Sequence, residues 1–322
     1  MNIFFEYGSI QSNPLYNCSS KTVKEWEKLQ GEPRAFIGYS TLIFGIFIEI
    51  LYFMCLTAIV QLNLLSSSCY KIMFCLGLVD MVVNLVSAVL SGYLFIVGAV
   101  YCSYPELIFI TGKIGNSGWS ASCVLTIILV INRIVDVMFP LHNKLIFSNN
   151  RTWYICLISL IYFLYIFMVT KSVLFNSKVM AWIEDPLIYS DQAYQYHSQY
   201  HFVNNIGFCI ISMILYSIYI IAVVKRQKKG WTPLTRNIFI QSSLIFLINC
   251  STSLIYAILI YVPPEPWIVL VGEYNWMFAH GSPALIYVVM NRKIRNKIIK
   301  WFYKKDQKRI SSILVAAEHQ TH

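Results

Sequence analysis

The sequence predicts an all-α membrane protein, a bundle of seven transmembrane helices followed by a short cytoplasmic amphipathic helix. Two observations predict this fold class. Hydrophobic residues make up 57% of the 322 residues and charged residues only 12%, whereas a soluble domain carries about 25% charged residues. The lysines and arginines are also concentrated in alternate connectors, as in proteins that cross a bilayer several times.

Seven stretches are long and apolar enough to cross the bilayer. A helix needs roughly 20 apolar residues to span the hydrocarbon core, where each backbone polar group must be bonded within its own segment. The stretches are Phe36–Val60, Ile72–Val100, Leu107–Phe139, Trp153–Leu174, Phe202–Val224, Ile238–Val262 and Trp267–Met290. Only short connectors separate them, so we expect one membrane domain over residues 36–290, with an extracellular segment at 1–35 and a cytoplasmic tail at 291–322.

Lysines and arginines orient the chain, because they are retained on the cytoplasmic side of a membrane. Eighteen of the 25 fall in one set of connectors and the tail, and six fall in the other set. The larger group comprises Lys71, Arg133, Lys144, Arg151, Lys225, Arg226, Lys228, Lys229, Arg236 and the nine from Arg292 to Arg309. The sequence therefore predicts a plasma-membrane protein with an extracellular N-terminus and a cytoplasmic C-terminus.

The first 35 residues contain no uninterrupted apolar core of the kind found in a cleaved signal peptide. We therefore expect the first spanning helix to act as an uncleaved signal anchor. Asn17-Cys18-Ser19 fits the sequon for N-linked glycosylation and lies in the segment predicted to be outside. Asn17 is a candidate glycosylation site for that reason.

A basic amphipathic helix is predicted directly after the seventh segment. Ile294, Ile298, Ile299, Trp301 and Phe302 recur at helical spacing among lysines and arginines. We expect this helix to lie in the membrane interface. Its basic residues would face anionic lipid, each contributing roughly 1 kcal/mol.

Ionisable side chains inside spanning segments cost roughly 2.5–3.5 kcal/mol each and are therefore candidates for function. The deepest ones here are Glu49, Asp80, Lys113, Glu273 and His280. The alternative is that each side chain meets a buried polar partner and only fixes how the helices pack.

Asp80 in the second predicted helix, Asn132-Arg133 at the end of the third, and Pro283 and Tyr287 in the seventh form a pattern. This pattern resembles the rhodopsin-like receptors that couple to G proteins. Asp80 stands where that family has an aspartate in its second helix, and Asn132-Arg133 ends the third helix where the family has an acidic residue followed by arginine. Pro283 and Tyr287 resemble the Asn-Pro-x-x-Tyr of the seventh helix, but Ser282 replaces the asparagine and the tyrosine falls one position late. In that family the acidic residue restrains the arginine by charge. Asn132 carries no charge, which puts this restraint on Arg133 in doubt.

A second set of short motifs carries a more specific resemblance: Tyr16-Asn17-Cys18-Ser19, Ile50-Leu51-Tyr52, Cys69-Tyr70-Lys71-Ile72-Met73, Asn132-Arg133, Pro283-Ala284-Leu285-Ile286-Tyr287 and Met290-Asn291. On these residues the chain looks like a nematode serpentine chemoreceptor of class T, and this resemblance covers nearly the whole chain. The resemblance implies a heptahelical receptor that passes a signal from an extracellular small molecule to a heterotrimeric G protein. It assigns coupling and activation to Asn132, Arg133, Pro283 and Tyr287.

Arg133 ends the third helix on the inner side, where a guanidinium reaches both neighbouring helices and an inserted partner helix. The alternative is that it snorkels to lipid phosphate. Asp80 lies about 12 Å into the second helix and Ser122 about 16 Å from Arg133, so the two can share a depth. We expect Asp80, Ser122, Ser282 and Asn249 to form a polar cluster that is hydrated or, as the resemblance implies, holds a sodium ion.

A ligand pocket is predicted at the outer end of the third helix. Lys113 and Asn116 are three residues apart on one helical face, and Trp119 lies below them. The connector after the fourth helix adds Tyr189, Tyr194, Tyr196, His197, Tyr200 and His201. This composition suits a small acidic or aromatic ligand. The alternative for the tyrosines is an aromatic belt at the membrane interface.

A disulfide between Cys18 and Cys102 is also expected. The rhodopsin-like pattern pairs a cysteine above the third helix with one in the connector after the fourth, but that connector contains no cysteine. Cys18 is the remaining cysteine on the predicted outer side. Such a bond in an oxidising compartment would tie the N-terminal segment over the pocket.

Other classes of function fit the sequence less well. A transporter is the leading alternative, because intramembrane charges also mark ion pathways, but no internal repeat is visible. A ligand-gated channel is a further alternative, although no pore-lining polar pattern is evident. An enzyme is not expected, since neither His-Glu-x-x-His nor Gly-x-Ser-x-Gly occurs. We expect no cofactor, metal or nucleic acid; the expected partners are a small-molecule ligand, a heterotrimeric G protein and membrane lipids.

Overall fold

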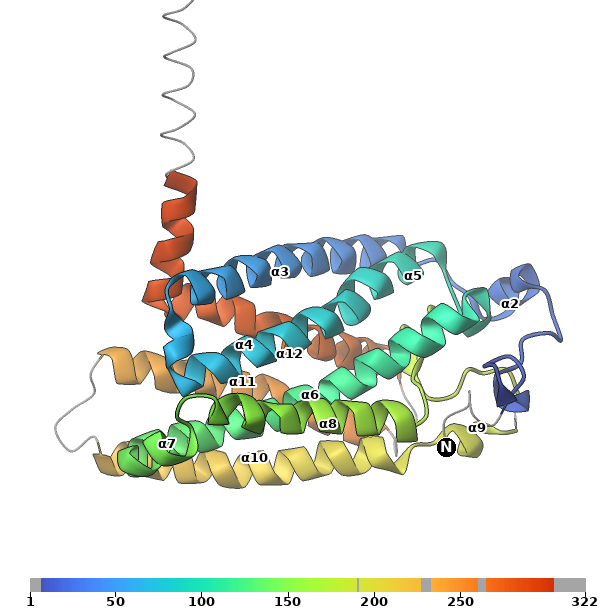
Figure 1. The fold of residues 1–322 in the computed structure, drawn as a ribbon. Coiled ribbons are helices and arrows are strands. Elements are labelled where there is room, and N and C mark those ends of the chain that lie inside the picture. Colours follow the sequence, from blue (N-terminus) through green and yellow to red (C-terminus); the bar gives the residue numbers. More distant parts are fainter. Residues whose placement is uncertain (1–6, 190, 227–232, 260–264, 304–322) are drawn as a thin grey trace, which may run out of the picture.

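The long helices run side by side in one bundle (Figure 1). The structure, a computed structural model, describes residues 7–189, 191–226, 233–259 and 265–303. One end of the bundle carries the N-terminal segment and the connector after α8, and we call it the N-terminal end. The other end carries α7 and the last helix of the chain. Because arginines and lysines gather there, we call it the basic end.

The order of the elements follows the predicted segments. The bundle consists of α3 (Ala35–Gln61), α4 (Ser68–Asn84) with its continuation α5 (Ser91–Val97), α6 (Pro105–Met138), α8 (Arg151–Val169), α10 (Gln199–Arg226), α11 (Pro233–Leu259) and α12 (Pro266–Met290). A π-helical stretch, Leu85–Leu90, joins α4 to α5. The shorter elements are α2 (Val23–Gln30), α7 (Pro140–Ile146), α9 (Ala193–Tyr196), the strands β1 (Leu174–Asn176) and β2 (Ala181–Ile183), and 3-10 turns at Pro14–Tyr16, Leu64–Ser66 and Tyr101–Ser103.

Within the described residues, six helices are long and apolar enough to cross a membrane: Ala35–Gln61, Ser68–Val97, Pro105–Met138, Arg151–Val169, Gln199–Arg226 and Phe239–Leu259. The seventh predicted segment is also a helix of the bundle, since α12 packs against α3, α4 and α11. Helix α12 is more polar in composition than these six helices, but its Glu273, His280 and Ser282 are at most 7% exposed. These polar side chains face the interior of the bundle, where protein rather than lipid surrounds them.

Large apolar side chains cover the outside of the bundle. Phe36 and Phe53 on α3 are 86% and 67% exposed, and Ile161 on α8 is 66% exposed. Apolar surface this extensive is not stable in water but suits contact with lipid chains. The fold is therefore that of an all-α, multi-pass membrane protein.

The fourth spanning helix is shorter than the sequence predicts. Helix α8 ends at Val169, and the residues from Ser172 to Leu174, which were expected to continue it, leave the helix and enter β1. Leu174 pairs with Ile183 in an antiparallel hairpin whose first strand is wholly buried. The predicted helix extends to Leu174 because the chain is mostly apolar up to that residue. The chain is apolar there because the hairpin is packed inside the N-terminal end of the bundle.

Helix α6 is continuous through the region that its glycines dilute. Gly112 allows the chain after α8 to approach closely, because a Cβ atom there would lie 1.8 Å from the carbonyl oxygen of Val173. The hydroxyl of Ser172 donates to the carbonyl of Phe109 at 2.7 Å in the same place. Gly112 therefore serves the packing of the connector after α8.

The N-terminal segment packs onto the bundle. Thr22 and Glu25 form a capping box at the start of α2, which satisfies two backbone N–H groups that no helical bond uses. Ile10, Tyr16 and Trp26 are each 2% exposed and belong to one apolar cluster with residues of α5, α6 and the hairpin. Residues 10–33 therefore form part of the N-terminal end of the bundle.

The predicted amphipathic helix is present as a helix over residues 292–303, set crosswise to the bundle (Figure 1). Ile294 and Ile298 are buried against the basic end, whereas Ile299 and Phe302 are 43% and 58% exposed. The helix thus presents one apolar face to the bundle and leaves a second one open to the surroundings. Residues 304–322 of the predicted tail lie outside the described residues.

The contact at Gly112 predicts a large difference between two glycine substitutions. Gly112→Ala should lower the melting temperature of the purified protein, because the added methyl overlaps the Val173 carbonyl and overpacking costs about 1–3 kcal/mol. The control is Gly207→Ala on α10, where an added Cβ meets nothing within 4 Å. Alanine stabilises a helix relative to glycine by up to about 1 kcal/mol, so this variant should melt no lower than the parent. Equal melting temperatures for the two variants would contradict the packing described.

Candidate functional site

A cavity of about 530 Å³ lies at the N-terminal end, between α6, α11, α12 and the connector after α8. Its volume falls within the roughly 300–1,000 Å³ of pockets that hold small molecules. The side chains that give it its character are Asn116, Trp119, Trp182, Glu184, Asp185, His197, His201, Tyr256 and Trp276. Aromatic walls and a few polar groups are the usual composition of a small-molecule site.

Two of the tryptophans are held in place by hydrogen bonds. The indole N–H of Trp119 donates to Asn205 of α10 at 2.8 Å. The indole N–H of Trp182, on β2, donates to the hydroxyl of Ser91 at 2.8 Å, and this hydroxyl in turn donates to the carbonyl of Val86 in the π-helical stretch. The hairpin is thereby anchored to the second spanning helix, and the cavity walls keep a fixed orientation.

The polar side of the cavity is acidic and histidine-rich. The Oε2 atom of Glu184 accepts the backbone N–H of Ser198 at 2.8 Å and lies 3.3 Å from the Nδ1 atom of His197. The Oε1 atom lies 3.7 Å from the Nδ1 atom of His201 and accepts no hydrogen bond. Partial burial raises the pKa of the neighbouring Asp185 carboxyl.

Two of the three predicted pocket residues line the cavity, and the third does not. Asn116 and Trp119 belong to the lining. Lys113 instead donates to the carbonyl of Phe167 at 2.6 Å, so its ammonium group faces α8. The ring of Phe167 lies 5.5 Å from the ammonium nitrogen, which adds a cation–π contact. Lys113 is therefore not part of the cavity lining, contrary to the prediction, because its side chain points away from the cavity.

Four of the six aromatic residues predicted in the connector fall into two groups. His197 and His201 line the cavity as expected. Tyr189 and Tyr196 instead donate to the backbone carbonyls of Pro14 and Leu15, at 3.1 Å and 2.5 Å. These tyrosines hold the N-terminal segment against the connector, and burial raises the pKa of the Tyr196 hydroxyl.

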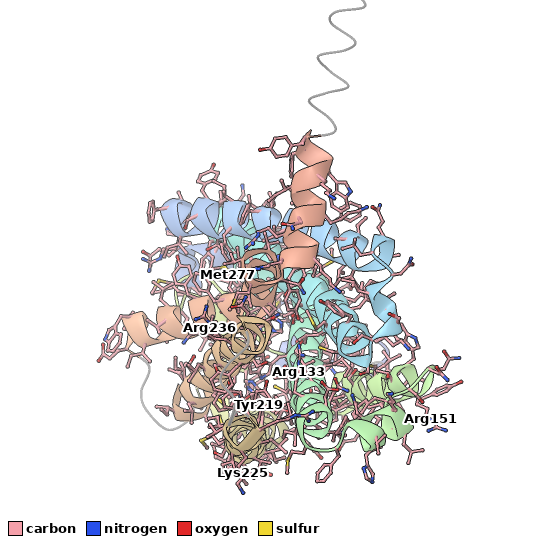
Figure 2. All side chains as sticks on the ribbon, turned by 90° about the vertical axis from the view of Figure 1, so that its left-hand side faces the viewer. Arg133, Arg151, Tyr219, Lys225, Arg236 and Met277 are labelled. Atoms are coloured by element: carbon pink, nitrogen blue, oxygen red, sulfur yellow. A yellow bond between two sulfur atoms is a disulfide. The ribbon has the colours of Figure 1, made fainter. Side chains whose placement is uncertain are left out.

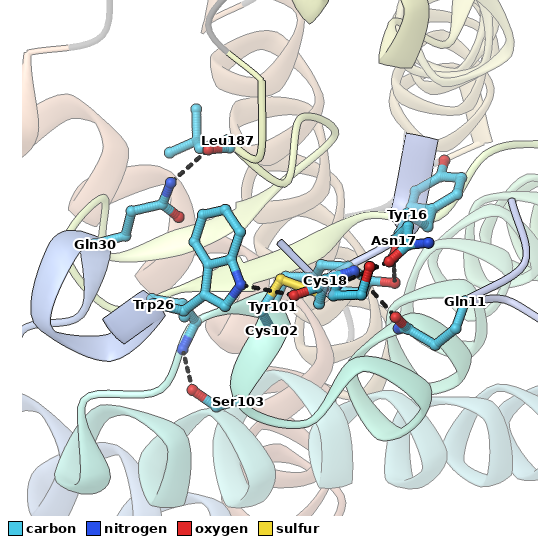
Figure 3. Close-up of a disulfide and its surroundings, with 12 residues drawn as sticks. Gln11, Tyr16, Asn17, Cys18, Trp26, Gln30, Tyr101, Cys102, Ser103 and Leu187 are labelled. Carbon is cyan, nitrogen blue, oxygen red and sulfur yellow. Dashed lines mark hydrogen bonds between the residues drawn. A yellow bond between two sulfur atoms is a disulfide. The ribbon is translucent and has the colours of Figure 1, made fainter. Parts of the chain in front are cut away.

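Cys18 and Cys102 are joined in a disulfide, the pairing that the sequence predicts (Figure 3). Their Cα atoms are 5.7 Å apart, a normal separation for such a bond. The indole of Trp26 donates to the carbonyl of Cys18 at 3.0 Å, and Gln11 accepts the backbone N–H of Cys18 at 3.1 Å. The bond ties the N-terminal segment to the 3-10 turn that precedes α6. Asn17, the candidate glycosylation site beside it, is half-buried and accepts the backbone N–H of Ser19.

Inside the bundle, the carboxylate of Asp80 is the centre of a polar cluster. Its Oδ1 atom accepts the hydroxyl of Ser122 at 3.0 Å and lies 2.8 Å from the Nδ1 atom of His280. Its Oδ2 atom lies 2.9 Å from the hydroxyl of Tyr52, which is also 2.6 Å from the carbonyl of His280. With Asp80 ionised, the Nδ1 atom of His280 is the donor in this pair, because a carboxylate only accepts hydrogen bonds.

The predicted members of this cluster are only partly correct. Ser122 bonds to Asp80 as expected, but the hydroxyl of Ser282 is buried without a partner and Asn249 donates to the carbonyl of Ile245 in its own helix. The side chains present do not fit a sodium ion. A hard cation needs several free oxygen ligands, whereas both oxygens of Asp80 already meet donors.

Sequence reasoning missed Tyr52 and His280 as partners of Asp80. His280 stands out in the sequence as an ionisable residue inside a spanning segment, but nothing along the chain indicates which helix its ring faces. Tyr52 carries no such signal, because tyrosine is common in apolar segments. Both positions depend on how α3 and α12 are rotated against α4, which only the packed bundle determines.

At the basic end, Asn132 joins three elements. Its amide donates to the hydroxyl of Ser68 at 3.0 Å and to Asn143 at 3.1 Å, and Asn143 donates to Asp136 at 2.8 Å. The side chain at the position where the resemblance expects an acid therefore binds α4 and α7. It does not restrain Arg133 by charge.

Arg133 lies near the centre of the basic end, next to Tyr219 of α10 (Figure 2). Its Nε atom is buried and has no hydrogen-bond partner. With Tyr219, Ser242 and Ile245 it lines a void of about 20 Å³, enough for about one water molecule. Among the described residues, Arg133 forms no ion pair, so its guanidinium is not fixed by a carboxylate.

Pro283 and Tyr287 lie in the second half of α12. Proline has no N–H, so the helix lacks one backbone hydrogen bond at this point. Tyr287 is fully buried, its hydroxyl has no partner, and it lies within electrostatic reach of both Asp80 and Arg133. Tyr287 thus stands between the polar cluster and the basic end.

Two comparisons with known proteins agree with each other. The chain matches the family model described as serpentine type 7TM GPCR chemoreceptor Srt over residues 3–311. It is also similar to serpentine receptor class T-55 of Caenorhabditis elegans, with 24% identity over 292 residues that cover 88% of this chain and 79% of that protein.

The Asp80 cluster predicts different effects for the same substitution at two serines. Ser122→Ala should lower the free energy of unfolding by about 1–2 kcal/mol, because Asp80 loses a donor inside the bundle. Ser282→Ala removes a buried hydroxyl that has no partner, and should leave stability unchanged or raise it. Thermal unfolding of the two purified variants in the same detergent measures the difference. A larger loss for Ser282→Ala would mean that the cluster is wrongly described.

Proposed function

Since the serpentine chemoreceptor model spans nearly the whole chain, the protein belongs to the Srt family of seven-transmembrane chemoreceptors, and we propose that it transmits the binding of an extracellular small molecule to a heterotrimeric G protein. The family is one of receptors and not of enzymes, and the chain is a multi-pass membrane protein. Coupling, ligand binding and orientation are the parts that we propose.

We propose that the N-terminal end faces the outside of the cell and the basic end the cytoplasm, at the plasma membrane. Arg133, Arg151, Lys225 and Arg236 come from four different helices and gather at the basic end (Figure 2). This distribution supports a cytoplasmic location, because positive charge is retained there. The Cys18–Cys102 disulfide supports an oxidising compartment at the opposite end.

The observation that carries the proposed function is that one continuous helix, α6, contributes residues both to the cavity and to the basic end. Asn116 and Trp119 of α6 line the cavity, and Arg133 of the same helix stands at the basic end. Seventeen residues at 1.5 Å per residue separate Asn116 from Arg133 by about 26 Å. A rigid helix that contacts both a ligand and a cytoplasmic partner is a direct means of coupling two sites.

A second set of contacts leads from the cavity to the polar cluster. The rings of Trp119 and Trp276, both in the cavity wall, lie 5.6 Å and 6.4 Å from the ring of His280. His280 in turn bonds to Asp80. A ligand that moves either tryptophan would therefore act on the hydrogen bonds that set the positions of α3, α4, α6 and α12.

Arg133 is the residue we assign to G-protein contact, with Asn132, Pro283 and Tyr287 in supporting roles. Its guanidinium has no carboxylate partner among the described residues, so it is available to bond an incoming helix. Asn132 holds the end of α6 against α4 and α7. The helix at residues 292–303 would lie along the cytoplasmic lipid surface, with Ile299 and Phe302 in the interface.

The proposal is tested by screening small molecules on cells that express the protein together with a G-protein reporter. A receptor gives a ligand-dependent reporter signal, and the purified protein then accelerates nucleotide exchange on an added G protein. A transporter would instead accumulate the same compound in sealed vesicles without any effect on nucleotide exchange.

The proposed orientation predicts opposite accessibility for the two chain ends. A tag before residue 7 should be stained by antibody on intact cells, and a tag after residue 322 only after permeabilisation, because seven crossings put the ends on opposite sides. If Asn17 carries a glycan, Asn17→Gln should abolish an endoglycosidase-sensitive shift in mobility. Staining of both tags on intact cells would disprove an odd number of crossings.

Substitution of Arg133 should separate coupling from folding. Arg133→Ala should reduce ligand-stimulated nucleotide exchange by about tenfold or more, since charged hydrogen bonds contribute about 1.5–3 kcal/mol. Arg151→Ala is the matched control, because Arg151 lies at the same end on α8 (Figure 2). It should keep exchange near the parental rate at equal surface expression. Equal losses in both variants would indicate only a general effect of positive charge.

A further inference from the structure

We propose that the cavity at the N-terminal end binds a small organic cation, an ammonium group carried on an apolar or aromatic body. This inference rests on the proposed function only in taking the cavity to be the site of the receptor's ligand. The lining described in the structure includes the carboxyl groups of Glu184 and Asp185 but no lysine or arginine. Apart from His197 and His201, which lie beside Glu184, the ionisable groups of the lining are therefore acidic.

Glu273 supplies the strongest argument. It is not itself one of the lining residues, but it lies on α12 one turn from Val269 and from Trp276, which both line the cavity, so it shares their face of the helix. Its carboxyl group also lies beside the backbone of Trp182, a third residue of the lining. Glu273 is only 4% exposed, and apart from the backbone of Trp182 no donor among the described residues reaches its carboxyl oxygens.

A buried carboxylate without a partner is costly unless a cation or hydrogen-bond donor completes it. No side chain among the described residues plays this role for Glu273. An ammonium group entering from the cavity would provide both the positive charge and the donors. Glu184 offers a second acceptor, because its buried Oε1 atom accepts no hydrogen bond.

The aromatic walls fit the same class of ligand. Trp119, Trp182, Tyr256 and Trp276 surround the cavity. The faces of indole and phenol rings attract cations, by about 0.5–2 kcal/mol for each contact, depending on desolvation. The same rings bury the apolar body of a ligand. An acidic ligand finds no such complement, because the nearest deep cation on α6, Lys113, is bonded to the carbonyl of Phe167 and faces α8.

The test compares three probes of nearly equal size on the purified full chain in lipid nanodiscs. The probes are 2-phenylethylammonium, 3-phenylpropionate and the neutral 2-phenylethanol. Binding is measured by the shift in melting temperature over a concentration series, which yields an affinity for each probe because a ligand stabilises the state it binds. The ammonium probe should bind at least about tenfold more tightly than either other probe.

Charge-neutral variants identify the groups responsible. Glu273→Gln and Glu184→Gln keep the shape of the side chain and should each weaken the ammonium probe by about tenfold or more, with little change for 2-phenylethanol. The matched control is Glu106→Gln, since Glu106 is an exposed glutamate in the first turn of α6 at the same end, whereas Glu273 is buried and Glu184 lines the cavity. It should bind all three probes like the parent. If one cavity variant fails to fold, the other still decides the result.

Three outcomes overturn the inference: no preference for the ammonium probe, a preference for the propionate, or an ammonium affinity unchanged in both cavity variants. Failure of all three probes to bind counts as no preference. These measurements use no G protein, so they are independent of coupling. A chain that binds the ammonium probe but never stimulates nucleotide exchange would refute the proposed function alone, and a chain that signals only to uncharged or acidic compounds would refute the ligand class alone.

Discussion

The hydrogen bonds on the Asp80 carboxylate are the interaction on which the rest of the bundle depends. They bring Tyr52 of α3, Ser122 of α6 and His280 of α12 to one point on α4. Inside a bilayer an unsatisfied polar group costs several kcal/mol, so four helices must be rotated to present these side chains to each other. The same requirement turns the polar face of α12 inward and lets a comparatively polar helix take its place in a membrane bundle.

The cavity exists because the connector after α8 folds into the bundle. A hairpin carries Trp182 to Ser91 and brings Glu184 to the cavity, while Gly112 lets the preceding chain lie directly on α6. The N-terminal segment covers this arrangement and is held by a disulfide and by two tyrosine hydroxyls. The result is an acidic, aromatic cavity whose walls are fixed by hydrogen bonds to three spanning helices.

The cavity and the basic end are related through a series of aromatic and polar side chains inside the bundle. His280 contacts two tryptophans of the cavity wall and bonds to Asp80, and Tyr287 follows it two turns later between Asp80 and Arg133. The uncharged Asn132 leaves Arg133 without the ionic restraint that the resemblance to rhodopsin-like receptors implies. In the proposed receptor, the resting position of the arginine would depend on helix packing alone.

The sequence by itself determined the order of the long helices of the bundle, because crossing a lipid layer needs a long apolar run that is visible along the chain, but it did not indicate the short helices α2, α7 and α9. It also indicated the Cys18–Cys102 pair by elimination, and it placed Asp80 and Ser122 at one depth because a helix rises by a fixed amount for each residue. It did not determine which way each helix faces. Lys113 was expected to face a ligand and instead bonds to the Phe167 carbonyl, and Ser282 was expected at Asp80, where His280 and Tyr52 are found. Helix rotation and the path of a connector are decided by contacts between residues far apart in the chain, and only the tertiary structure contains those contacts.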